Sequence, residues 1–260
     1  MTTNEPFELE AVPRRVMHLI FLVDTSGSMS GTKIASLNTA VRETLNDIGE
    51  ISANNGDAQI KVAVLEFSSG AQWMYPQPEP SEDFKWQDLE ASGLTSLGAA
   101  YSELNVKLSK SSGFMAEPTG SRAPAMILLT DGMPTDDYKR PLEKLKANPW
   151  FKAGVKVAVA IGDTDTNVGV LAEFTSDMEA VFTVHTKDQL KNIIRTVSVT
   201  ASLVASQSAS VSVSADGTPV DAQSQMVANM TGAIKTDDAL RNVDQGNSTA
   251  NSGTDNWDKW

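Results

Sequence analysis

Small oxygen-bearing side chains follow the first apolar run of the sequence at every second position. They are Asp24, Ser26 and Ser28, in the stretch FLVDTSGSMS. A second aspartate, Asp131, follows another apolar run in LLTDG, and Thr95 precedes a helical pattern in SGLTSLGAA. Carboxylate and hydroxyl oxygens are the ligands that hard cations prefer in proteins. These five residues, called the oxygen cluster below, therefore predict a site for Mg²⁺, with Mn²⁺ and Ca²⁺ as further candidates.

The oxygen cluster combines two carboxylates with three neutral hydroxyl groups, so it only partly saturates a divalent ion. Such a site leaves a position for a carboxylate from another molecule. Gly27 allows the backbone to pass close to the ion, and Gly132 follows Asp131 directly. Asp163 and Asp165, in IGDTDTN, follow another apolar run; they are candidates for the rim of the site or belong to a solvated acidic turn.

Apolar runs alternate with helical patterns along most of the chain. The runs expected to be strands are residues 16–23, 60–67, 125–130, 155–161 and 181–184. The patterns expected to be helices are residues 33–52, 96–108, 136–147, 168–174 and 187–204. This alternation predicts an α/β fold with a mostly parallel central sheet and helices on both faces. Residues 71–76 follow a strand too closely for a parallel crossover, which predicts one antiparallel edge strand.

In an open α/β sheet, ligands bind beyond the carboxyl ends of the strands, where the oxygen cluster is expected. We divide the chain into an N-terminal extension (residues 1–14), one domain (residues 15–206) and an acidic tail rich in Ser, Asn and Asp (residues 207–260). The tail lacks apolar periodicity and is expected to be largely disordered. It ends in NWDKW, where Trp257, Asp258 and Trp260 form a recognition motif or pack back on the domain.

Composition excludes several classes of function. The 260-residue chain has a formal net charge of -12, so it lacks the basic surface that nucleic-acid binding requires. It has no cysteine, which excludes disulfides, zinc-thiolate sites and a cysteine nucleophile. Residues 196–215 carry no charge, but half of them are Ser, Thr or Gln, and no basic segment leads into an apolar one at the N-terminus. We therefore expect a cytoplasmic protein that does not insert into membranes.

The motif DTSGS, a later threonine and a later TDG resemble the metal-ion-dependent adhesion site (MIDAS) of von Willebrand factor A (VWA) domains. The resemblance covers residues 15–206 and is closest to bacterial tellurium-resistance (TerY-like) proteins. It implies a Rossmann-like VWA fold whose MIDAS positions are the oxygen cluster. It also implies that the hydroxyls bind the ion directly and the aspartates mostly through water. The sequence GLT replaces the more usual double glycine before Thr95.

The family resemblance implies a non-enzymatic, metal-dependent protein-binding module in a stress-response or tellurium-resistance system, whose partner presents Glu or Asp. Kinase-like or phosphatase-like partners are implied by the family alone. One alternative is a phosphotransfer enzyme that uses Asp24 as the phosphoryl acceptor. Another is a metal-free scaffold, and a third interprets DTSGS as an Asx turn with Ser30 or Thr32 capping a helix. A phosphate loop and a serine hydrolase do not match the glycine spacing around Gly27 or Ser26.

Overall fold

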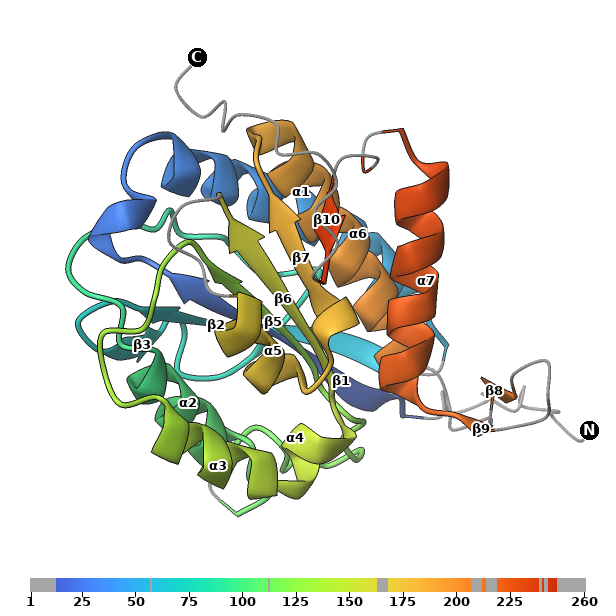
Figure 1. Ribbon diagram of the computed structural model, residues 1–260. Helices are drawn as coiled ribbons and strands as arrows, with labels where there is room; N and C mark the ends of the chain where they lie inside the picture. Colours follow the sequence, from blue (N-terminus) through green and yellow to red (C-terminus); the bar gives the residue numbers. More distant parts are fainter. Residues whose placement is uncertain are drawn as a thin grey trace, which may run out of the picture.

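An eight-stranded sheet forms the centre of the computed structural model (Figure 1). The structure describes residues 13–56, 58–111, 113–162, 168–206, 212–213, 219–238, 240 and 243–246. Parallel strands occur in the order β7-β6-β5-β1-β2. They are β1 (Arg15–Asp24), β2 (Ala58–Phe67), β5 (Ala125–Thr130), β6 (Val155–Ile161) and β7 (Val181–Val184). Each coincides with a predicted apolar run, so the expected α/β class and its mostly parallel sheet are confirmed.

Both edges of the sheet carry antiparallel strands. At one edge, β3 (Ala71–Trp73) and β4 (Glu79–Pro80) pair with β2, as expected for a strand that follows too closely for a crossover. At the other edge, β10 (Asp244–Gln245) pairs with β7. The sequence predicted one antiparallel edge, and β10 adds the second. A separate two-stranded ribbon joins β8 (Ser212–Val213) to β9 (Pro219–Val220).

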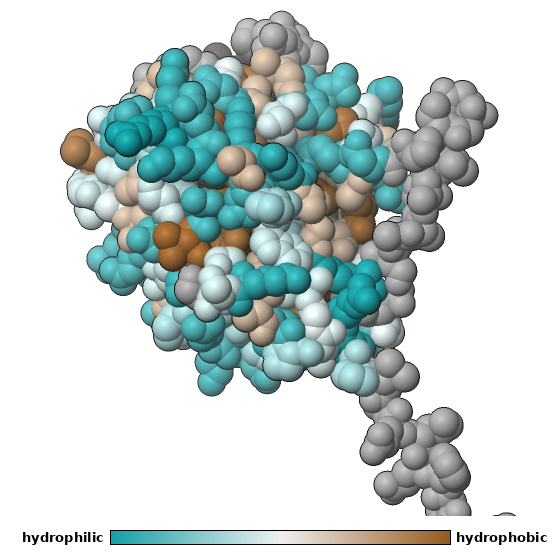
Figure 2. All heavy atoms as spheres, turned by 90° about the horizontal axis from the view of Figure 1, so that it is seen from below, coloured by the Kyte–Doolittle hydropathy of each residue, from teal (hydrophilic) through white to brown (hydrophobic). Residues whose placement is uncertain are grey.

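Helices cover both faces of the sheet (Figure 1). One face packs against α1 (Thr32–Asn54), α6 (Lys187–Ser206) and α7 (Ala222–Thr236). The other packs against α2 (Leu97–Lys107), α3 (Lys139–Ala147), α4 (Pro149–Ala153) and α5 (Val168–Thr175). Two 3₁₀ turns complete the regular structure, η1 (Gly27–Met29) and η2 (Met178–Ala180). From the side of α2, α3 and α4, the surface is mostly hydrophilic with small separate hydrophobic patches (Figure 2).

Burial on both faces explains why the central strand β1 is almost continuously apolar. Leu19 and Phe21 lie in the core beneath α1 and α6, whereas Ile20 and Leu22 lie in the core beneath α2 and α5. All four side chains are fully buried. Because successive residues of a strand point to opposite faces, a strand covered on both sides favours apolar residues at nearly every position. This burial fixes the register of β1 and hence the place where Asp24 leaves the sheet.

Part of the segment predicted to be a disordered tail is folded, which corrects that prediction for the described residues. Asp221 caps α7 by accepting the Ser224 backbone N–H at 2.9 Å. Met226 and Met230 of α7 are fully buried in the same core as α1 and α6. Their spacing of four residues is helical, but the polar residues around them hid this short apolar stripe. The terminal Trp257, Asp258 and Trp260 lie outside the described residues.

A partly buried cluster of ionisable side chains joins β1 and β2 to the loop after α2. His18 of β1 is fully buried, and its Nε2 lies 3.4 Å from Glu117 Oε1. Lys61 of β2 donates to the same oxygen at 2.8 Å. His18 and Lys61 together lower the pKa of Glu117 from 4.5 to about 2. Burial lowers the pKa of His18, so its ring is neutral at pH 7.

We expect Glu117→Gln to destabilise the fold by about 1–2 kcal/mol at pH 7, because Lys61 loses a partly buried ionic partner. The pKa of Glu117 is lower in the folded state, so its contribution to stability is complete above pH 4.5. It is lost as the pH falls towards 2. Urea unfolding at pH values from 2 to 7 measures this effect. An equal gap between variant and wild type at every pH would contradict it.

Candidate metal centre

Asp24 ends β1 with both carboxylate oxygens held by the protein. Oδ1 accepts the backbone N–H of Ser26 at 2.8 Å, and Oδ2 accepts the Thr130 hydroxyl at 2.5 Å. The residue is fully buried, and this burial raises its pKa, with a further contribution from the charge of Asp131. The contact with Ser26 is the Asx turn considered as an alternative. The predicted helix cap is wrong, however, because the N-cap of α1 is Gly31 and no side chain caps it.

Ser26, Ser28 and Asp131 form a chain of short polar contacts beside Asp24. The hydroxyl oxygens of Ser26 and Ser28 are 3.0 Å apart. Ser28 then donates its hydroxyl to Asp131 Oδ1 at 2.7 Å. The side chain of Asp131 is fully buried. Two loops that are 103 residues apart in sequence, after β1 and after β5, are therefore joined through the predicted ligands.

Thr95 belongs to a third loop, which hydrogen bonds hold against the loop after β1. Ser92 N–H donates to the Thr25 carbonyl at 2.7 Å, and Gly27 N–H donates to the Gly93 carbonyl at 3.1 Å. Gly93 has a φ of 80°, and a Cβ there would lie 2.5 Å from the Ser69 hydroxyl oxygen, so this bend requires glycine. These contacts fix the register of Thr95, although GLT replaces the more usual double glycine before it.

The hydroxyl and carboxylate oxygens of three loops converge beside Gly132. A Cβ on Gly132 would lie 3.5 Å from the Ser28 hydroxyl oxygen, 3.5 Å from the Thr95 hydroxyl oxygen and 4.0 Å from Asp24 Oδ2. The absence of a side chain at Gly132 thus keeps a small space open among these oxygens. The structure brings the whole oxygen cluster together, and the all-oxygen donor set fits a divalent cation. Their role as ligands stays a prediction.

The other candidate positions differ in outcome. Gly132 lies at the oxygen cluster, whereas a Cβ on Gly27 would lie 3.4 Å from the Gly93 carbonyl oxygen, at the contact between two loops. Asp163 and Asp165 lie outside the described residues. Within the described part of the chain, no group of three or more His, Cys, Asp or Glu residues is placed to hold a metal ion. A site here depends on serine and threonine oxygens.

Asp136 caps a helix that precedes it in the chain. The sequence PTDD is typical of the start of a helix that follows it, but that helix, α3, begins at Lys139. Asp136 instead accepts the backbone N–H groups of Gly98 and Ala99, each at 3.0 Å, and so caps α2. It thereby ties the loop after β5 to the helix that follows Thr95. A local pattern identifies a capping residue but not which of two nearby helices it caps.

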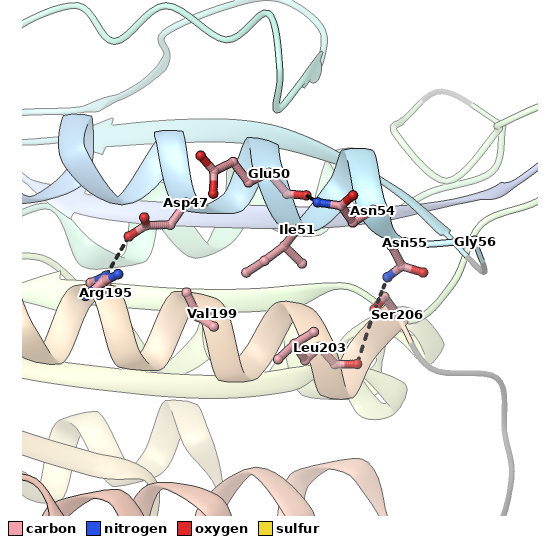
Figure 3. A pocket seen from close by; sticks show the side chains of 10 residues that line it. All are labelled: Asp47, Glu50, Ile51, Asn54, Asn55, Gly56, Arg195, Val199, Leu203 and Ser206. Atoms are coloured by element: carbon pink, nitrogen blue, oxygen red, sulfur yellow. Dashed lines mark hydrogen bonds and ion pairs between the residues drawn. The ribbon is translucent and has the colours of Figure 1, made fainter.

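Two exposed apolar side chains flank the oxygen cluster. Leu94, which precedes Thr95, is 59% exposed, and Met133, which follows Gly132, is 45% exposed. A groove of about 630 Å³ lies elsewhere, between α1 and α6 (Figure 3). Asp47 and Arg195 form an ion pair of 2.6 Å at that groove. None of the cluster residues lines it, so the groove and the oxygen cluster are distinct features.

Family comparison identifies the domain. The family model for the von Willebrand factor type A domain matches residues 18–196. The chain therefore belongs to the VWA family, as its motifs had indicated. No curated protein matches the sequence significantly. Among the described residues, no helix is both long and apolar enough to cross a membrane.

Solved structures share this fold at low identity. A von Willebrand factor type A protein from Catenulispora acidiphila is 19% identical, with a TM-score of 0.53 over 72% of this chain and 43% of that chain. The pilus adhesin SpaC from Lactobacillus rhamnosus GG, in its open conformation, is 15% identical, with a TM-score of 0.56 over 71% of this chain and 30% of that chain.

A third structure, proximal thread matrix protein 1 from the mussel byssus, has zinc in its MIDAS motif. It is 18% identical, with a TM-score of 0.52 over 70% of this chain and 47% of that chain. This chain spans less than half the length of each of the three proteins. At these identities the likeness shows a common fold, and a common ligand or partner does not follow from it.

Proposed function

We propose that this VWA domain binds a partner protein through a divalent cation held by the oxygen cluster. The observation that carries the proposal is the convergence of Asp24, Ser28 and Thr95 oxygens beside Gly132, with Asp131 bonded to Ser28. The ion supplies an electrophilic position that accepts a carboxylate oxygen from a Glu or Asp of the partner. Leu94 and Met133 are exposed next to this position and contribute apolar contact area.

The residues of the cluster divide the work. The three hydroxyl groups are neutral metal ligands, so the ion keeps part of its charge for the partner's carboxylate. Asp131 accepts the Ser28 hydroxyl, Asp24 accepts the Ser26 backbone N–H, and both aspartates supply negative charge. Mg²⁺ suits this hard, oxygen-only set, and Mn²⁺ and Ca²⁺ share the same ligand preference. A protein of net charge -12 needs such an ion if it is to attract an acidic partner.

A binding role fits the site better than phosphotransfer. A phosphoryl-accepting aspartate must meet its substrate, whereas both oxygens of Asp24 accept internal hydrogen bonds and the residue is fully buried. We therefore propose a binding module, as the family resemblance implies, in preference to a phosphotransfer enzyme that uses Asp24. Its cytoplasmic location rests on composition, and its place in a tellurium-resistance or other stress-response system, with kinase- or phosphatase-like partners, rests on sequence resemblance alone.

Affinity capture tests the function. The tagged chain is incubated with lysate of its source organism in Mg²⁺, in EDTA, and in Mg²⁺ with Thr95→Val as bait. Thr95→Val removes one hydroxyl and keeps the shape of the side chain. We expect a protein that is retained in Mg²⁺ and lost in the other two conditions. Equal retention in all three would contradict metal-dependent binding and favour the metal-free scaffold.

A further inference from the structure

Lys33 is a cation already in contact with the oxygen cluster. Its Nζ donates to Asp131 Oδ2 at 2.6 Å, and its side chain is 22% exposed. The other oxygen of Asp131, Oδ1, accepts the Ser28 hydroxyl. Both oxygens of this buried carboxylate are therefore taken by groups of the chain itself.

The position of Lys33 in the fold is otherwise unfavourable. It lies in the first turn of α1 (Thr32–Asn54), which contains no acidic residue. The amino end of a helix carries a partial positive charge, so a lysine there is unfavourable unless an anion compensates. Asp131, which comes from the loop after β5, is that anion. The ion pair between α1 and the loop after β5 thus offsets a local cost that a lysine further along α1 would not have.

We propose that Lys33 competes with the divalent cation for Asp131 and so sets the metal affinity of the site. This inference rests on the proposed function, since it concerns the same oxygen cluster. A divalent ion, or water bound to it, reaches Asp131 Oδ2 only when the ammonium group withdraws. Lys33 and the ion also carry like charges at close range, which weakens ion binding further. The 22% exposure of the lysine side chain leaves it a route to solvent.

Calorimetric titration of the full chain with Mn²⁺ tests the proposal. Lys33→Gln removes the competing charge and keeps a polar side chain. Lys191→Gln is the matched control, because Lys191 makes an ion pair of the same length, 2.6 Å, with Glu43 on the surface. We expect Lys33→Gln to lower the dissociation constant for Mn²⁺ about tenfold and Lys191→Gln to change it less than about twofold.

A second measurement uses the unmutated protein and does not depend on the folding of a variant. Reductive methylation of lysines, quantified by peptide mass spectrometry, reports how available each ammonium group is. We expect methylation of Lys33 to increase severalfold when Mn²⁺ is added, while that of Lys191 stays constant. An unchanged or lower rate at Lys33 in saturating Mn²⁺ would overturn the competition.

Asp24→Asn separates the two proposals. Suppose that wild type binds Mn²⁺ and that Asp24→Asn does not. If Lys33→Gln then binds Mn²⁺ no more tightly than wild type, the proposed role of Lys33 is wrong and the metal site stands. If wild type and Asp24→Asn bind Mn²⁺ equally, or if neither wild type nor Lys33→Gln binds it, the metal site itself is wrong, and the role of Lys33 with it.

Discussion

Replacing Asp24 by Asn is expected to abolish Mg²⁺ and Mn²⁺ binding and to raise the thermal stability of the metal-free protein. Burial raises the pKa of Asp24, which means that the folded protein holds the charged carboxylate at a cost. Asparagine has the same shape and still accepts the Ser26 N–H through its oxygen. Removal of the charge leaves a single carboxylate in the oxygen cluster, which raises the dissociation constant for any divalent cation at least about a hundredfold.

The stability gain has a defined pH dependence. The pKa of Asp24 is higher in the folded state than its ordinary value of 3.8. The folded protein therefore binds the proton at a pH where the unfolded chain is already ionised, and stability is lost as the pH rises above 3.8. The cost is complete above the folded pKa and absent well below 3.8. Asp24→Asn should exceed wild type at pH 7 and match it at pH 3.

Differential scanning calorimetry at pH 7 and pH 3, without metal and with Mn²⁺, checks both parts. A gain of about 1 kcal/mol corresponds to about 2–4 °C in a domain of this size. Asp88→Asn is the control, because Asp88 pairs with Arg42 on the surface and both side chains are largely exposed. A lower midpoint for Asp24→Asn at pH 7, or an unchanged rise of its midpoint with Mn²⁺, would contradict the prediction.

The sheet was predictable because strands that are buried on both faces have mostly apolar sequences. The strand that ends at Asp24 is almost entirely apolar, and β5 beside it is apolar up to Thr130, since helices cover both of their sides. The oxygen cluster was predictable for a related reason. In a parallel sheet, the residues at the carboxyl ends of neighbouring strands lie close together. Asp24 and Asp131 follow β1 and β5, which pair directly.

Long-range partners were not predictable in the same way. Lys33 lies in an ordinary helical pattern, and only the fold brings it to Asp131, 98 residues away. Asp136 has a capping sequence, but the helix it caps precedes it in the chain. For α7, the buried Met226 and Met230 are surrounded by polar residues, so tertiary packing rather than composition decides that the segment folds. In each case the deciding contact joins segments that are distant in the sequence, or it is made by apolar residues whose neighbours in the sequence are polar.

Gly98→Ala is expected to destabilise the domain and to weaken metal binding, although Gly98 has no side chain that could pack in the core or bind the ion. A Cβ on Gly98 would lie 2.5 Å from the Asp137 carbonyl oxygen and 3.0 Å from Tyr138 Cα. The loop after β5 must therefore move away from α2. The same loop provides Asp136, whose carboxylate caps α2 through the N–H groups of Gly98 and Ala99. Strain and a weakened cap together cost about 2–3 kcal/mol.

The displacement also reaches Thr95. Thr135 accepts the Thr95 N–H through its hydroxyl at 3.1 Å and donates its own N–H to the Thr95 carbonyl at 2.9 Å. A shift of the loop after β5 therefore moves Thr95 relative to Asp131, which lies at the start of that loop. Because a misplacement of about 1 Å is enough to impair a preorganised site, we expect the dissociation constant for Mn²⁺ to rise at least about tenfold.

Gly232→Ala is the matched control and should have the opposite sign. Gly232 lies within α7, and a Cβ there would meet nothing within 4 Å. Alanine at such a helical position stabilises by about 0.5–1 kcal/mol, because glycine loses more backbone entropy on folding. Urea unfolding and Mn²⁺ titration of both variants compare the two glycines directly. If Gly98→Ala behaved like Gly232→Ala in both measurements, the close contact between α2 and the loop after β5 would not be what positions Thr95.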